Sequence, residues 1–209
     1  MRKRVRVRHH VNPLRSPFLA RRLPALTLPP DRAIEAELGC ADARFLFERA
    51  PQHREVLFLG LEIREPLVGE VNRQAAELGL DNLRAVFCNI NVDLPSLLPD
   101  ASLSRAFINF PDPWFKRRHQ KRRLMNDELV TVLHAKLRPG AELFFQSDVF
   151  ELALDAMAVL ESAPTQFANL RGPWSFARDN GYGARSLREV QCEGRGVRIW
   201  RMCYGRVGA

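Results

Sequence analysis

An α/β fold with a mostly parallel sheet and helices on both faces is the architecture that this sequence predicts. From Asp31 onward, short apolar runs alternate with segments of helical periodicity, which is the pattern of strands joined by crossover helices. Polar residues follow directly where several of these runs end, as they do in open α/β sheets that bind ligands. The 209 residues, of which 46% are hydrophobic, suffice for one well-buried domain.

Seven strands are expected, because seven apolar runs have the length and the boundaries of strands. The second run, VLFLGLEI, gives the strongest pattern, and the last two runs give weaker ones. In chain order the runs lie at residues 33–38, 56–63, 83–88, 103–110, 141–146, 166–170 and 197–204.

Four helices are expected between the strands, at residues 44–50, 66–78, 126–137 and 150–161. A turn at Gly39 precedes the first helix, and Gly79 ends the second. Asn126 is the expected N-cap of the third helix, since its side chain can accept a hydrogen bond from a backbone amide of the first turn. The Arg-Pro-Gly sequence at 138–140 is a stop signal that should separate this helix from the next strand.

Positive charge is concentrated in two places. The net charge is +8, but residues 1–30 carry eight Lys and Arg and no acid, and residues 110–124 carry six basic residues and one acid. The rest of the chain is therefore net acidic, and two local basic patches indicate a polyanionic partner rather than a membrane surface. Residues 1–28 are expected to form a mobile basic arm and linker, and residues 29–209 the folded domain.

The cysteines and the hydropathy pattern exclude several classes of protein. Four cysteines are scattered and form no C-x-x-C pair, so reduced thiols in the cytoplasm are expected, without a disulfide framework or a metal site. No apolar run reaches the 18 residues of a membrane span, and the Arg-rich start lacks the apolar core of a signal peptide. Nothing in the sequence indicates an obligate protein partner.

The segment FPDPWFKRRHQKRRL, residues 110–124, is the most informative part of the chain. Asp112 lies between two prolines that stiffen its backbone, and Trp114 follows. A rigid carboxylate beside an aromatic ring can accept the N1–H and N2–H₂ donors of a guanine, while the basic run holds phosphates. Alone, Pro-Asp-Pro is an ordinary turn and a basic run an ordinary solvated surface. The apolar strand before this segment places it where α/β sheets bind ligands.

Three other strand ends suggest a cofactor that contains adenosine. Gly39 provides the first strand–helix turn, Glu62 can accept ribose hydroxyls at the end of the second strand, and Asn89 can meet an adenine amino group at the end of the third. Each signal is weak alone, because glycine turns and solvated acids at strand ends are common. The three residues together indicate an adenosine cofactor more specifically than any one of them does.

With these motifs, the sequence resembles the bacterial tRNA (guanine-N(7))-methyltransferases, which use S-adenosylmethionine. The resemblance runs over residues 33–204, and residues 110–124 are its most specific part. GLDNLR at 79–84, LRPG at 137–140 and FQSD at 145–148 resemble further motifs of the family. The resemblance implies a Rossmann-like class I methyltransferase with a seven-stranded, mostly parallel sheet. It also implies a tRNA substrate, methylated at a guanosine of the variable loop.

The same resemblance implies roles for individual residues. Asp112 matches the catalytic aspartate. S-adenosylmethionine is expected to be held by Glu37, Gly39, Glu62, Asn89 and Asp112. The tRNA is expected to be bound by Lys116, Arg118, His119, Lys121, Arg122, Arg123, Asp148, Ser186 and Glu189.

The chain departs from the family pattern mainly in the glycine-rich loop. Gly-x-Gly-x-Gly has become Gly39-Cys40-Ala41-Asp42-Ala43, and an alanine with positive φ at position 41 costs on the order of 1–2 kcal/mol. Milder departures are Phe115 in place of a proline, Asn89 in place of an aspartate, and Ser147 and Ser186 in place of threonines. Two alternatives stay open: a non-catalytic tRNA-binding relative, and a methyltransferase that acts on another RNA or on protein.

Overall fold

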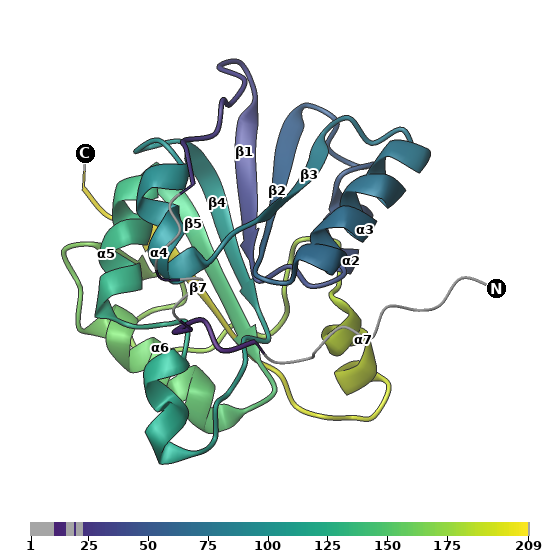
Figure 1. Cartoon of the computed structure of the whole chain (residues 1–209). Helices are drawn as coiled ribbons and strands as arrows, with labels where there is room; N and C mark the ends of the chain where they lie inside the picture. The colour runs from purple at the N-terminus through teal and green to yellow at the C-terminus, as the bar shows by residue number, and fades with distance from the viewer. Residues whose placement is uncertain (1–10, 16–18, 20–22, 209) are drawn as a thin grey trace.

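A seven-stranded sheet lies between two layers of helices in the computed structural model of the chain (Figure 1). The structure describes residues 11–15, 19 and 23–208. The strand order is β3-β2-β1-β4-β5-β7-β6; β1 to β5 run parallel, and β7 is antiparallel to β5 and β6. The strands are β1 (Ala33–Leu38), β2 (Val56–Glu62), β3 (Leu83–Phe87), β4 (Leu103–Asn109), β5 (Leu137–Ser147), β6 (Phe167–Asn169) and β7 (Trp200–Arg206).

The helices divide between the two faces of the sheet, as Figure 1 shows. One face carries α4 (Ile90–Leu97), α5 (Asp127–Lys136) and α6 (Phe150–Glu161). The other face carries α2 (Arg44–Arg49), α3 (Glu65–Glu77) and α7 (Leu187–Glu193). A short 3₁₀ helix, η1 (Arg117–Arg122), follows β4. The predicted α/β architecture with helices on both faces is therefore confirmed.

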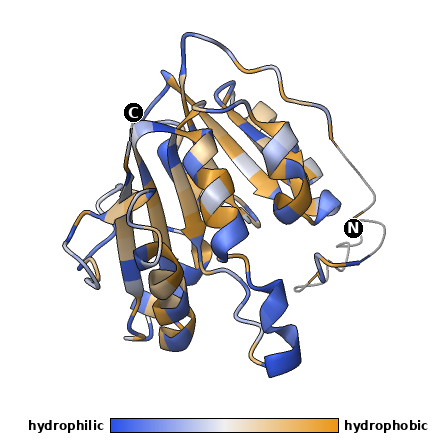
Figure 2. Cartoon of the chain, turned by 90° about the vertical axis from the view of Figure 1, so that its left-hand side faces the viewer, coloured by the Kyte–Doolittle hydropathy of each residue, from blue (hydrophilic) through white to orange (hydrophobic). Residues whose placement is uncertain are grey.

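Each face of the sheet has its own hydrophobic core, because successive side chains of a strand point to opposite faces. On β4, Phe107 packs with the side chains of α2 and α3, and the next residue, Ile108, packs with those of α4, α5 and α6. Phe144 and Phe145 of β5 divide in the same way. Figure 2 shows the result, with mostly hydrophobic strands and hydrophilic residues on the outer parts of the helices.

Most of the expected elements are present. β1 and α6 have the predicted bounds, and the predicted cap of α5 is confirmed by a 2.9 Å hydrogen bond from the Leu129 amide to Asn126 Oδ1. The expected end of this helix before 138–140 is confirmed, since α5 ends at Lys136 with Leu137 as its C-cap. The next strand begins earlier than the predicted residue 141, because β5 starts at Leu137 and includes residues 138–140. These residues accompany an irregularity in the β4–β5 register, with Gly140 at φ 73°.

Three short elements do not follow from the apolar pattern. α4 contains Pro95, which normally argues against a helix interior. η1 has the sequence RRHQKR and buries no side chain. α7 has only seven residues, so its periodicity is too short to detect.

The described part of the predicted N-terminal arm contacts the domain. The Leu26 amide donates to the Leu97 carbonyl at 2.8 Å, and Leu23, Leu26 and Leu28 pack against the core on the α4 side. Residues 1–10, 16–18 and 20–22 lie outside the described residues, so the prediction of a mobile arm over 1–28 stays a prediction. Among the described helices, none is long and apolar enough to cross a membrane.

Candidate active site

A cavity of about 470 Å³ is lined by residues at the carboxyl ends of the parallel strands. These strand ends form the lower edge of the sheet in Figure 1. The cavity brings together all five residues expected to hold the cofactor: Glu37, Gly39, Glu62, Asn89 and Asp112. It is also lined by Arg64, Trp114, Arg122, Ser186 and the first two residues of α7, Leu187 and Arg188. Residues that are far apart in the sequence thus share one site because parallel strands end at a common edge.

Glu37 is a buried acid with one unsatisfied oxygen. Its Oε1 accepts a 2.7 Å hydrogen bond from Asn109 Nδ2, and its Oε2 is buried with no partner in the described structure. Burial, opposed by the Asn109 hydrogen bond and reinforced by the charges of Asp42 and Glu62, raises the pKa of Glu37 to about 8. The site therefore holds a buried carboxyl group that can accept from a cationic ligand once its proton leaves.

Glu62 is equally buried, but both of its oxygens have partners. Its Oε1 accepts from the backbone amide and Nε of Arg64, both at 2.9 Å. Its Oε2 accepts from Arg64 Nη2 at 2.8 Å and from the Ala41 amide at 2.9 Å. These bonds raise the pKa of Arg64. The carboxylate that was expected to meet ribose hydroxyls is thus covered by a neighbouring guanidinium.

The loop of residues 39–43 keeps a glycine-like backbone although two of its glycines are replaced. Gly39, Ala41 and Ala43 have φ values of 83°, 51° and 54°, so the condition for strain at Ala41 is met. Cys40 packs so closely on β2 that a Cβ added to Gly60 would lie 2.6 Å from its Sγ. The loop is therefore fixed by the strand behind it and by the Ala41 bond to Glu62.

Asn89 is held by both the N-terminal segment and α4. Its Nδ2 donates to the Pro13 carbonyl at 2.9 Å, and its amide donates to Asp93 Oδ2 at 2.7 Å. Val11 and Pro13 line the same cavity. Part of the N-terminal segment therefore forms one wall of the candidate site.

The Asp112 segment makes two sharp turns. Phe110 and Trp114 have φ values of 49° and 45°, unusual for large side chains. The Phe110 amide donates to the Gln146 carbonyl at 2.8 Å, and Arg123 Nε donates to the Pro113 carbonyl at 2.9 Å. Partly buried Asp112 is thus held on a rigid loop between β4 and η1.

The six residues expected to bind tRNA from the basic run fall into two groups. Lys116, Arg118, His119 and Lys121 are partly or fully exposed on or next to η1. Partial desolvation, followed by the charges of Arg122, Arg118 and Lys116, lowers the pKa of His119. These side chains form a positive surface beside the cavity, as a phosphate-binding run should.

Arg122 and Arg123 are directed toward the protein. The guanidinium of Arg122 lies 5.0 Å from the ring centroid of Trp114, and its Nε is buried without a partner in the described structure. Arg123 is 13% exposed, pairs with Asp155 and bonds the Pro113 carbonyl. Arg123 therefore supports the Asp112 loop, and its contact with tRNA stays a prediction.

The remaining predicted substrate residues lie at different depths: Asp148 follows β5, Ser186 precedes α7, and Glu189 lies on α7. Ser186 lines the cavity and caps α7, with its Oγ accepting from the Glu189 amide at 3.2 Å. Asp148 lies outside the cavity lining and pairs with Arg188, which lines it. Glu189 is 1% exposed, so it is a buried support in this structure, and its direct contact with tRNA stays a prediction.

A buried chain of hydrogen bonds joins Glu189 to the cofactor side. Glu37 bonds Asn109, and Asn109 Oδ1 accepts from Gln146 Nε2 at 2.9 Å. Gln146 Nε2 also donates to Glu189 Oε2 at 2.9 Å, and Arg201 bonds both Gln146 and Glu189. Since these residues come from β1, β4, β5, α7 and β7, the chain links both halves of the site. We name it the polar chain.

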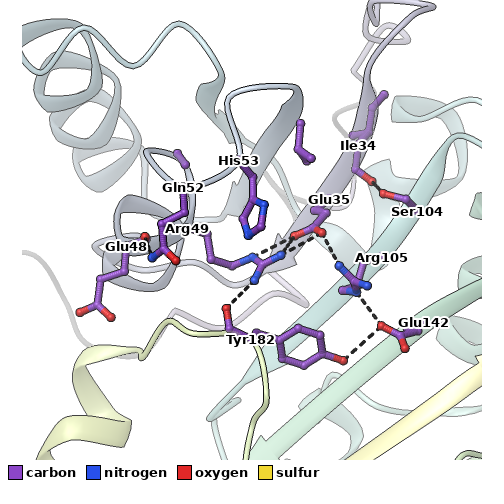
Figure 3. Close-up of polar contacts among 12 residues, drawn as sticks. Ile34, Glu35, Glu48, Arg49, Gln52, His53, Ser104, Arg105, Glu142 and Tyr182 are labelled. Carbon is purple, nitrogen blue, oxygen red and sulfur yellow. Dashed lines mark hydrogen bonds and ion pairs between the residues drawn. The ribbon is translucent and has the colours of Figure 1, made fainter.

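A second buried network fixes the segment before α7, residues 180–186, which we name the strap. Figure 3 shows Arg49 between Glu35 and the strap. Arg49 makes a bidentate ion pair with Glu35, in which Nε donates to Oε2 and Nη2 to Oε1, both at 3.0 Å, and Nη2 lies 2.7 Å from Oε2 as well. Arg49 Nη1 also donates to the Tyr182 carbonyl at 2.7 Å. The Arg185 amide donates to Glu48 at 2.8 Å. The last residues of α2 thus hold the strap in place, and the strap positions Ser186 in the lining of the cavity.

Several residues of the site escape sequence reasoning. Asn109 and Gln146 face each other in the β4–β5 register, and a polar residue at the end of each apolar strand is the signal that could have identified them. Arg64 follows Glu62 by two residues, which gives no signal without the fold. Among the described residues, no group of three or more His, Cys, Asp or Glu could hold a metal ion.

Comparison with known proteins agrees with this geometry. A family model described as "Putative methyltransferase" matches residues 31–187. The "tRNA (guanine-N(7)-)-methyltransferase" of Synechococcus elongatus is 40% identical, with 97% of each chain covered. The protein of that name from Trichormus variabilis is 37% identical, again with 97% of each chain covered.

A solved structure confirms the fold independently of close sequence similarity. The 16S rRNA (adenine(1408)-N(1))-methyltransferase from Catenulisporales acidiphilia matches with a TM-score of 0.59, at 14% identity, over 84% of this chain and 85% of that one. At such low identity the match supports the Rossmann-like methyltransferase fold alone.

Proposed function

The chain belongs to the family of tRNA (guanine-N(7)-)-methyltransferases, and we propose that it transfers a methyl group from S-adenosylmethionine to N7 of a guanosine in tRNA. The observation that carries this proposal is the convergence of Glu37, Glu62, Asn89 and Asp112 on one cavity beside a strongly basic helix. Acids at neighbouring strand ends suit an adenosine cofactor, and the basic helix suits a polyanion.

The residues present fit S-adenosylmethionine. The buried Oε2 of Glu37 has no partner in the described structure and would accept from the cofactor's ammonium group. Asn89 would meet the adenine, and Glu62 the ribose hydroxyls. Because Arg64 and the Ala41 amide occupy Glu62, ribose binding requires the Arg64 guanidinium to give up at least one oxygen.

Alignment accounts for most of the chemistry in this proposal. When bound, S-adenosylmethionine supplies a methyl group on a positively charged sulfur. Guanine N7 has a free lone pair, so the protein needs no base to deprotonate it. Asp112 would accept the N1–H and N2–H₂ donors, orient the ring, and offset the positive charge that develops on it. The bond from Arg123 to the Pro113 carbonyl keeps the Asp112 loop from drifting.

The decisive experiment uses radiolabelled S-adenosylmethionine with tRNA, with ribosomal RNA and with protein extract. We expect label in tRNA alone, recovered as 7-methylguanosine after digestion. Label in another RNA or in protein would support the second alternative, and no label in any substrate would support a non-catalytic relative.

Asp112→Asn should reduce tRNA methylation by at least about 100-fold, because the amide can accept at only one of two positions and carries no charge. Binding of S-adenosylmethionine, measured by calorimetry, should persist. The matched control is Asp81→Asn, since Asp81 is exposed at the start of β3, at the other end of the strands. Turnover close to wild type in Asp112→Asn would remove Asp112 from the mechanism.

A further inference from the structure

Three aromatic side chains form a cluster beyond the candidate active site, in which Phe150 is exposed and Phe176 and Trp200 are partly buried against the core. The ring centroid of Trp200 lies 4.5 Å from that of Phe150 and 5.0 Å from that of Phe176. The guanidinium of Arg198 lies 3.9 Å from the Trp200 centroid. We name these four residues the aromatic platform. Single exposed apolar residues are common on proteins. An exposed ring that contacts two further rings and lies near an arginine is a larger surface, of the kind on which a ligand can bind.

The platform continues the edge of the sheet that carries the site. Trp200 pairs with Ser147 in the β5–β7 ladder, and Phe150 follows Asp148 by two residues. The order along this edge is Glu37 on β1, Asp112 after β4, Asp148 after β5, and then Trp200 on β7. Two strand spacings, about 10 Å, separate the ends of β4 and β7. A nucleotide next to a base held at Asp112 can reach that far.

The chemistry of the platform suits an RNA base. Phe150 is 42% exposed, so part of its ring is open to a stacking partner. Arg198 is exposed and forms no ion pair in the described part of the chain, so its charge is available to a phosphate or a base. Aromatic rings and arginine planes are the surfaces on which unpaired RNA bases stack.

From this arrangement we propose that the aromatic platform is an RNA-binding subsite, on which a base that neighbours the target guanosine stacks. The proposal rests on the proposed function, since it takes tRNA as the ligand. It assigns Phe150 and Arg198 to different tasks. Phe150 contributes stacking, which does not depend on salt, and Arg198 contributes both stacking and charge.

The test is tRNA affinity measured over a salt series. Phe150→Leu should weaken tRNA binding about fivefold or more at every salt concentration without changing the log–log slope, whereas Phe150→Tyr should bind as wild type. Arg198→Gln should weaken binding and reduce the slope by up to about one unit. The matched control is Leu154→Ala, one turn further along α6 and 40% exposed, which should bind tRNA as wild type.

Calorimetry with S-adenosylmethionine should give wild-type affinity for all these variants, because none of the substituted residues lines the cavity. Wild-type tRNA affinity in Phe150→Leu would overturn the proposal. So would a wild-type dimer, seen by sedimentation, that Phe150→Leu abolishes while tRNA affinity is unchanged, since the platform would then bind a second copy. Failure of the proposed function has a separate signature: unlabelled tRNA in the methylation assay, whatever the affinity series shows.

Discussion

Glu37 and Glu62 are the same residue type at neighbouring strand ends, yet their surroundings give them different properties. Glu62 is saturated by Arg64 and the Ala41 amide. Glu37 accepts one hydrogen bond, from the Asn109 side-chain amide, its other oxygen has no partner among the described residues, and its pKa is raised to about 8. Before a ligand binds, Glu37 is therefore mostly protonated at neutral pH. Neither property can be predicted from the sequence, which shows only two acids near the ends of two apolar runs.

We expect cofactor binding to release a proton from Glu37. A cationic amino group favours the ionised carboxylate, so at pH 7 the proton must leave when S-adenosylmethionine binds. Affinity should rise up to about tenfold per pH unit below pH 8 and level off above it. Calorimetry in buffers of different ionisation enthalpy measures the number of protons released.

Glu37→Gln is the control for this measurement, because it keeps the Asn109 contact and cannot ionise. Titration of the cofactor's own amino group is common to both proteins, so the difference in proton release between them is due to Glu37.

The free energy of unfolding should change over the same pH range. The folded pKa lies above the usual 4.5, so the contribution of Glu37 is complete below pH 4.5 and is lost as the pH rises through 8. Equal proton release by both proteins would exclude Glu37 as the source.

Among the elements, the loop of residues 39–43 shows how a glycine-rich turn persists without its glycines. Ala41 and Ala43 both have the left-handed conformation that glycine adopts without strain. Tight packing behind the loop and the bond from the Ala41 amide to Glu62 hold it there. The loop therefore keeps its shape at a cost in stability.

Ala41→Gly should stabilise the protein by about 0.5–1 kcal/mol, because the relief of strain exceeds the added chain entropy of glycine. Ala43→Gly should be close to neutral, since Ala43 is fully buried and also loses a packed methyl group. Urea unfolding measures both. The control is Ala36→Gly in β1, where no strain exists, and this variant should be destabilised. A destabilised Ala41→Gly would show that the loop is not strained at this position.

The sequence predicts the long apolar elements well and the short polar ones poorly. β1 and α6 follow from apolar periodicity because both are packed against a core. η1 escapes prediction because all its residues are polar. The buried position of Glu189 escapes because α7 is too short to show which of its faces is covered. The five residues expected to hold the cofactor could be placed in one cavity from the sequence, since each stands at or near a strand end. The pairing of Arg64 with Glu62 could not, because it depends on how one side chain folds back over the strand end.

At the scale of the whole molecule, two buried networks hold the strap and α7 against the sheet. The Arg49 network acts near the middle of the strap, and the polar chain acts at α7. Arg49 also lies between 5.4 and 5.8 Å from the ring centroids of Phe45, Phe58, Phe107 and Tyr182. Parts of the chain more than 130 residues apart therefore meet through one guanidinium.

Arg49→Met should destabilise the fold by roughly 3 kcal/mol, because it leaves buried Glu35 with fewer partners and releases the Tyr182 carbonyl. The double variant Glu35→Gln/Arg49→Met should recover at least half of this loss, since no buried charge then lacks its partner. Urea unfolding of both checks the prediction. Arg73→Met, which breaks only exposed pairs on α3, should cost less than about 1 kcal/mol. A similar small loss for Arg49→Met would contradict the assigned role.

The polar chain also constrains how this protein can evolve. Glu37, Asn109, Gln146, Glu189 and Arg201 each use a neighbour in the chain as donor or acceptor. A substitution at any one position leaves a buried donor or acceptor of the neighbouring residue without its hydrogen-bond partner. A second substitution, at that neighbour, is then needed to restore the lost stability. The effects of substitutions at these positions on stability should therefore be strongly non-additive. Related proteins that differ at one of these positions should also differ at a neighbouring one.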